Sequence, residues 1–86
     1  MDIKATAHIK SDRSEIRIEI WNWDNWTPDK SGIPANLTDE LEQRGYINTN
    51  DMLHGYRLTT EAANGPTEMA WLKSKNISLG QGGFYD

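Results

Sequence analysis

The sequence predicts a small α+β domain made of an N-terminal antiparallel β-hairpin, a tryptophan-rich loop, two short helices and a second short hairpin. Two observations support this fold class. Residues 2–10 and 15–20 alternate between apolar and polar side chains, which is typical of half-buried strands. Residues 37–44 and 66–75 are bordered by helix start and stop signals. The 86-residue length suits one domain.

The first hairpin is predicted from the side chains that share a face of each strand. Its first strand covers residues 2–10, and a polar connector at residues 11–14 leads into the second strand. The residues expected to point inward are Ile3, Ala5, Ala7 and Ile9 on the first strand, and Ile16, Ile18 and Ile20 on the second. Closely spaced turn formers then predict a loop from Asp24 to Ala35.

The first helix is expected at Leu37 to Arg44, with Asn36 as its N-cap and Gly45 in the left-handed position that ends it. Two short apolar runs follow, at 46–47 and 56–59, and the polar loop between them indicates a second hairpin.

The second helix is expected to begin at Pro66 and to end near Lys75, with Met69 and Leu72 facing inward. Ile77 and Leu79 suit a final short strand. The domain is therefore expected to span residues 1–79, and residues 80–86 are too glycine-rich to hold a conformation alone and are expected to form a flexible tail.

Composition and charge exclude several classes of protein. Nine basic and 13 acidic residues give a net charge of -4, and the basic residues are scattered rather than gathered in the stripe typical of nucleic-acid binding. No candidate helix has the Lys/Arg-rich face of a membrane-surface anchor, and no apolar run is long enough to span a bilayer. The lack of cysteine favours a soluble cytoplasmic protein.

Three of the four tryptophans lie within six positions, at Trp21, Trp23 and Trp26. If the second strand continues without a bulge, Trp21 and Trp23 fall on the face opposite the isoleucines. Clustered exposed indoles are typical of an interface. The alternative is that a bulge near Trp21 resets the alternation, or that the second helix covers that face, so that the tryptophans belong to the core.

No motif for catalysis, a metal or a cofactor is present. The only histidines, His8 and His54, have no second ligand at a suitable spacing, and Gly80–Gly83 lacks the lysine and helix of a phosphate loop. We therefore expect no catalytic residues, no metal site, no cofactor and no enzymatic activity.

Residues 41–61 resemble the wing region of winged-helix transcription regulators of the PadR or MarR kind. The similarity consists of a helix that ends at Gly45, a short strand at 46–47, a loop, and a second strand that contains Leu58 and Thr59. It implies nucleic-acid binding through Arg44 and Arg57. The chain departs from the family pattern because a β-hairpin replaces the helix-turn-helix. In addition, three carboxylates, at Asp39, Glu40 and Glu42, lie in the helix that would meet the phosphates.

The leading functional hypothesis is a non-enzymatic protein-binding domain, such as an inhibitor or accessory factor of a phage or mobile element. The expected partner is a protein, and a basic nucleic-acid-handling protein would suit the acidic surface. The residues expected to contact it are Arg17, Glu19, Trp21, Trp23, Asp24 and Trp26. A homodimer is a further possibility, formed through an edge strand that ends in the indoles.

Overall fold

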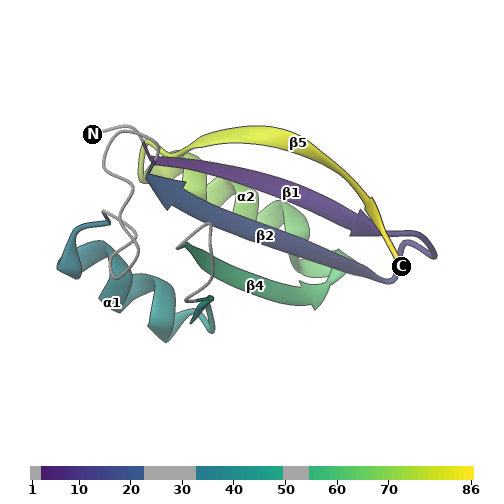
Figure 1. Ribbon diagram of the computed structural model, residues 1–86, viewed down its shortest axis with the longest axis horizontal. Coiled ribbons are helices and arrows are strands. Elements are labelled where there is room, and N and C mark those ends of the chain that lie inside the picture. The colour runs from purple at the N-terminus through teal and green to yellow at the C-terminus, as the bar shows by residue number, and fades with distance from the viewer. Residues whose placement is uncertain (1–2, 23–32, 50–54) are drawn as a thin grey trace.

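The computed structural model describes residues 3–22, 33–49 and 55–86, with residues 21 and 22 described by their backbone alone. Its described part is a mixed α+β fold built on one five-stranded sheet in the order β3-β4-β2-β1-β5 (Figure 1). The strands are β1 (Ile3–Lys10), β2 (Glu15–Asn22), β3 (Ile47–Asn48), β4 (Tyr56–Glu61) and β5 (Ser78–Tyr85). The helices are α1 (Ala35–Gln43) and α2 (Gly65–Ser74), and the short 3-10 helix η1 (Ala62–Asn64) precedes α2.

The predicted first hairpin is confirmed. β1 and β2 pair in antiparallel register without interruption from Ile3 opposite Asn22 to Ile9 opposite Ile16. Because no bulge occurs in this register, the backbone position of Trp21 belongs to the same alternating set as Arg17 and Glu19.

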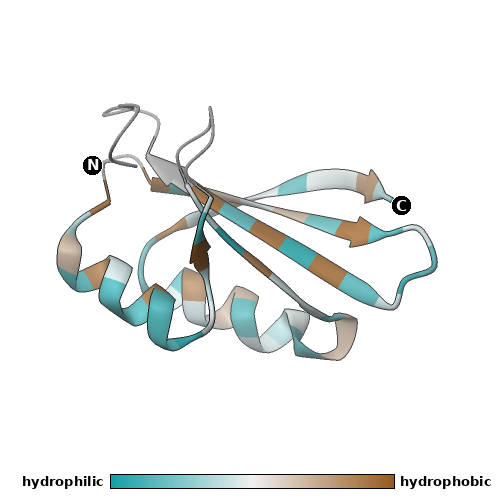
Figure 2. Cartoon of the chain, turned by 60° about the horizontal axis from the view of Figure 1, so that its bottom comes forward, coloured by the Kyte–Doolittle hydropathy of each residue, from teal (hydrophilic) through white to brown (hydrophobic). Residues whose placement is uncertain are grey.

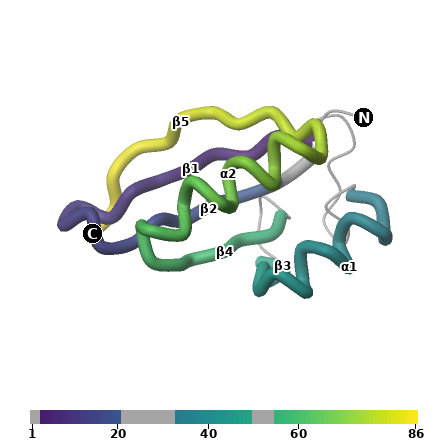
Figure 3. Tube along the Cα trace, turned by 180° about the vertical axis from the view of Figure 1, so that it is seen from behind, coloured from purple at the N-terminus to yellow at the C-terminus, as the bar shows by residue number. Residues whose placement is uncertain are grey.

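Both helices lie on the same side of the sheet (Figure 2), and Figure 3 shows α2 running across that side from behind. The core lies between the helices and the isoleucine face of β2. Its largest fully buried side chains are Ile18, Ile20, Leu41 and Leu72. The apolar alternation of the first two strands therefore faces the helices, as expected.

α1 starts two residues earlier than predicted, at Ala35, so Asn36 lies inside the helix and Pro34 holds the N-cap position. The expected cap by Asn36 is wrong. Proline fits here because its fixed φ of -58° suits helix entry and its missing N–H costs the first turn no hydrogen bond. Gly45 has a φ of 99°, which confirms the predicted left-handed stop.

Residues 80–86 were expected to form a flexible tail, but most of them belong to a strand. Residues 78–85 form β5, which pairs in parallel with β1. The pairing shifts register between Ala7 and Ile9, where Gly82 and Gly83 lie opposite the single residue His8. The neighbouring strand supplies hydrogen bonds that a glycine-rich segment cannot make alone.

The second hairpin has β3 antiparallel to β4, and β4 pairs in turn with β2. β2 therefore has a partner on each side. The suggestion that this tryptophan-bearing strand is an edge strand is wrong, because β3 and β5 form the edges of the sheet. Among the described residues, no helix is long and apolar enough to cross a membrane.

Candidate interaction surface

The face of the sheet opposite the two helices is the candidate site, and we call it the open face. No described helix covers it (Figure 2). Its members alternate with the core residues along the strands. They are Lys4, Thr6, His8 and Lys10 from β1, Glu15, Arg17 and Glu19 from β2, Arg57, Thr59 and Glu61 from β4, and Tyr85 from β5.

Glu19 joins three strands across this face. Its carboxylate lies 3.5 Å from Nε2 of His8 and 3.4 Å from a terminal nitrogen of Arg57. Folding thus gives His8 the carboxylate neighbour that its surroundings in the sequence lack. His8 also accepts a hydrogen bond from the backbone N–H of Gly83 at Nδ1, 3.2 Å away. These contacts tie the ring to β2 and β5.

Arg17 is held differently from the other cations of the open face. Its guanidinium lies 4.2 Å from the centre of the Tyr85 ring, and no carboxylate within the described part of the chain forms an ion pair with it. Burial raises the pKa of Tyr85, and the nearby Glu15 adds to the rise. Stacking uses the face of the guanidinium and leaves the terminal nitrogens at its edge to bind a ligand, whereas Nε is buried.

A hollow of about 340 Å³ opens at the β3 end of the open face. Its lining includes Ile47, Arg57 and Thr59. Ile47 is 70% exposed, and Thr59 is the register partner of Arg17. The surface thus combines an exposed aliphatic side chain, a concave region and a stacked cation. Arginine is enriched at protein interfaces relative to the rest of the surface.

The predicted contact residues fall into three groups. Arg17 and Glu19 lie on the open face. The backbone of Trp21 continues their alternating set in β2 and is paired with Lys4. Trp23, Asp24 and Trp26, like His54 and most of the expected loop between Asp24 and Ala35, lie outside the described residues.

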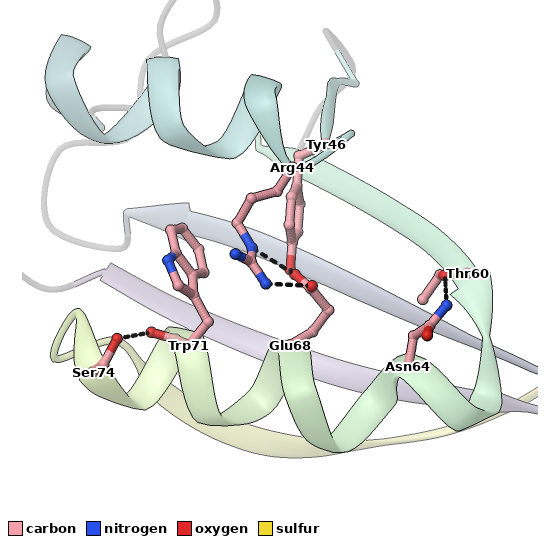
Figure 4. A network of polar contacts seen from close by, with 7 residues as sticks. All are labelled: Arg44, Tyr46, Thr60, Asn64, Glu68, Trp71 and Ser74. Carbon is pink, nitrogen blue, oxygen red and sulfur yellow. Dashed lines mark hydrogen bonds and ion pairs between the residues drawn. The ribbon is translucent and has the colours of Figure 1, made fainter.

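The helix side of the sheet contains a separate polar cluster (Figure 4). Arg44 donates two hydrogen bonds to the Glu68 carboxylate, from Nε at 3.1 Å and from Nη2 at 2.6 Å. The Tyr46 hydroxyl donates a third at 3.2 Å. The Arg44 guanidinium also lies 4.5 Å from the centre of the Trp71 ring. This cluster ties the end of α1 to α2.

Burial and hydrogen bonding raise the pKa values of two groups in this cluster. Burial raises the pKa of Tyr46, and the Glu68 charge together with its hydrogen bond adds to the rise. The hydrogen bonds to Glu68 raise the pKa of Arg44. The Glu68 carboxylate thus receives all three donors of the cluster.

The two arginines of the nucleic-acid hypothesis do not share a surface. Arg44 lies in the polar cluster on the helix side, whereas Arg57 belongs to the open face and pairs with Glu19. The partners of Arg44 were not predicted from the sequence. Glu68 and Trp71 are spaced three residues apart on one helix, which is a signal for a shared face, but nothing local identifies the residue they meet.

Among residues 3–22, 33–49 and 55–86, no cluster of three or more potential metal-ligating side chains occurs. No protein-family model, curated protein or solved structure matches the chain.

Proposed function

We propose that the chain is a non-enzymatic protein-binding domain that acts by occupying another protein through the open face of its sheet. The observation that carries this proposal is that both helices lie on one side, while the opposite side is left without a covering helix in the described part of the chain. A sheet face of this kind offers a rigid platform, because its backbone is fixed by pairing across five strands.

The chemistry of the open face supports a protein as the ligand. Ile47 supplies apolar area beside the hollow, and Arg17 supplies a cation already ordered by Tyr85. Arginine is among the residues that dominate binding energy at protein interfaces. Ordering Arg17 before binding lowers the entropy lost when the complex forms.

Three tryptophans follow Glu19 in the sequence, at the end of β2 and directly after it. Trp21, Trp23 and Trp26 would anchor the partner, and Glu19 and Asp24 would orient it. The net charge of -4 suits a basic partner, such as a protein that handles nucleic acid, whose approach it would accelerate. Inhibitors and accessory factors of phages act in this manner, and that likeness is an analogy of size and form.

The proposal is tested with a pair of matched variants used as baits. Thr59→Arg adds bulk and charge on the open face opposite Arg17, and Thr67→Arg makes the same change at an exposed position of α2. Proteins captured from a host extract by the unmodified chain are identified by mass spectrometry, and their affinities are then measured with purified protein. We expect Thr59→Arg to weaken binding at least tenfold and Thr67→Arg to leave it unchanged.

A further variant tests the anchors. Trp21→Ala combined with Trp23→Ala should accelerate dissociation, whereas added salt should mainly slow association. Equal binding by the two threonine variants would contradict the choice of face. Intact affinity of a folded double tryptophan variant would contradict the choice of anchors.

Nucleic-acid binding, which the winged-helix resemblance implies, is separable by a gel shift at low salt. The control is Arg57→Glu, because Arg44 is engaged by Glu68 and its replacement would also disturb the polar cluster. A shift that Arg57→Glu abolishes would favour a nucleic-acid ligand over the protein partner proposed here.

A further inference from the structure

β5 is an edge strand without the features that usually protect such edges. It lies at one end of the sheet, and its eight residues, SLGQGGFY, include no charged residue and no proline. Natural edge strands commonly use charges or proline to prevent pairing with another chain. No strand of the described residues pairs with the outer edge of β5, and this edge is therefore able to accept a further strand.

Two large apolar side chains of β5 face the same side of the sheet. Leu79 pairs with Ala5 and Phe84 pairs with Ile9, and both partners belong to the helix-facing set. The bulge at Gly82 and Gly83 makes this possible, because residues five apart in a regular strand point to opposite faces. Leu79 is 41% exposed and Phe84 is 66% exposed.

A hollow of about 310 Å³ lies beside Leu79 on this side of β5. Apolar side chains dominate its lining, which consists of Ala7, Ile9, Met69, Leu79, Gly80 and Gln81. A second hollow, of about 460 Å³, adjoins it between α2 and the start of β5. Unfilled apolar space next to an unpaired strand indicates that an apolar side chain of a partner belongs there.

We infer that β5 pairs in antiparallel fashion with β5 of a second copy of this chain, so that each Leu79 lies opposite the partner subunit's Phe84. Leu79 is one residue from the start of β5 and Phe84 is one residue from its end. With a two-fold axis at the middle of β5, the contact between Leu79 and Phe84 therefore occurs twice, as a self-complementary interface requires. The partner's Phe84 then lies next to the hollow beside Leu79.

The backbone of β5 favours a second copy as the occupant, and its side chains do not oppose one. Two chains of net charge -4 repel each other, but β5 has no charged side chain to add repulsion along the seam. Gly82 and Gly83 lie near the proposed axis, where the absence of side chains allows the two bulged segments to approach. This inference is independent of the open face and of the proposed function.

The first test measures molar mass by light scattering over a concentration series. The 9.8 kDa chain should approach twice that mass as its concentration rises. Phe84→Lys should weaken self-association at least tenfold, because it places a charge at the seam. The matched control is Ile47→Lys, which changes a similarly exposed side chain on the opposite edge strand β3 and should leave association unchanged.

The second test locates the two-fold axis of the proposed dimer. The chain has no cysteine, so Gln81→Cys introduces a single thiol. Because Gly82 and Gly83 share one register position, Gln81 is the midpoint between Leu79 and Phe84. In the proposed register its two copies therefore lie opposite each other on the same face, about 4.5 to 5.5 Å apart between Cα atoms, within the range that a disulfide spans. Mild oxidation should therefore give a covalent dimer with Gln81→Cys and none with Thr59→Cys on the open face.

Three results would overturn the inference: a monomer at every concentration, loss of the dimer through Ile47→Lys instead of Phe84→Lys, or a dimer without a Gln81→Cys crosslink. Circular dichroism establishes that each lysine variant is folded, and the crosslink tests the seam even if Phe84→Lys does not fold. Partner capture by Phe84→Lys distinguishes the two proposals, because the open face is unchanged in that variant.

Discussion

The two faces of the sheet hold their side chains by different means. On the helix side, Ile18 and Leu72 are fully buried, and the buried Glu68 is satisfied by three donors. On the open face, charges meet across strands at 3.4 to 4.0 Å while remaining partly exposed. Stability therefore depends mainly on the helix side, as the proposed role of the open face requires.

The largest expected difference between the faces comes from truncating one residue on each. Ile18→Ala should lower the free energy of unfolding by about 2 to 5 kcal/mol, because it leaves a cavity in the core. Thr59→Ala should lower it by less than about 1 kcal/mol, because the side chain is exposed. Urea denaturation measures both values, and equal losses would contradict the division between the faces.

The polar cluster is expected to matter more than the exposed ion pairs. Glu68→Ala should cost about 2 to 3 kcal/mol, because it leaves the Arg44 and Tyr46 donors without their acceptor. Its control is Glu40→Ala, which removes the exposed ion pair with Lys75 and should cost less than about 1 kcal/mol. If the two variants unfold at the same urea concentration, Glu68 does not lock α1 to α2.

Gly82, on the open side of the sheet, is expected to tolerate a larger side chain as poorly as a core position. A Cβ at Gly82 would lie 2.4 Å from the His8 ring and 2.7 Å from the Ala7 carbonyl oxygen, whereas one at Gly83 meets nothing within 4 Å. Gly82→Ala should therefore destabilise the chain by about 1 to 3 kcal/mol through overpacking.

The effect of Gly82→Ala should be concentrated in β5, where amide hydrogen exchange should accelerate. Gly83→Ala should change stability by less than about 0.5 kcal/mol. Comparable exchange rates in the two variants would show that the contact between His8 and β5 is looser than the structure indicates. Both variants are best compared at a concentration that keeps the chain monomeric.

The smallest expected effect is a loss of stability in alkaline solution that depends on Tyr46. Burial raises the pKa of Tyr46 in the folded chain, so Tyr46 contributes stability below its unfolded pKa of about 10 and loses it as pH rises through the folded value. One such proton changes stability by about 1.4 kcal/mol per pH unit above pH 10.

Tyr46→Phe should make the alkaline loss of stability shallower without abolishing it, because the pKa values of Tyr56 and Tyr85 are also raised. Denaturation midpoints on either side of pH 10 measure the slope. An unchanged slope in Tyr46→Phe would assign the alkaline sensitivity to the other two tyrosines.

Local patterns predicted much of the fold. The alternation in β1 and β2 has period two and depends on neighbours in sequence, so it indicated both the strands and the face that meets the helices. Pro66 and Gly45 likewise act within one turn of their own helices. β5 could not be predicted in full, because its glycines become a strand only through pairing with β1.

The contacts of the polar cluster and of the candidate site were harder to predict for the same reason. Arg44 is an isolated cation in the sequence, and its structural use depends on Glu68, 24 positions away. The role of Arg17 depends on Tyr85, near the opposite end of the chain. Sequence periodicity indicates which face a residue occupies, but it does not identify which strand lies alongside.

The parallel pairing of β5 with β1 also constrains the order of folding. The β1–β2 hairpin needs only its own residues, whereas the contact between Ser11 and Tyr85 closes a loop of 74 positions. Contacts this distant are slow to form because the chain between them must lose its entropy first. Until the last strand arrives, β1 has one unpaired edge, and for that interval the newly made hairpin is the part of the molecule most exposed to misassembly.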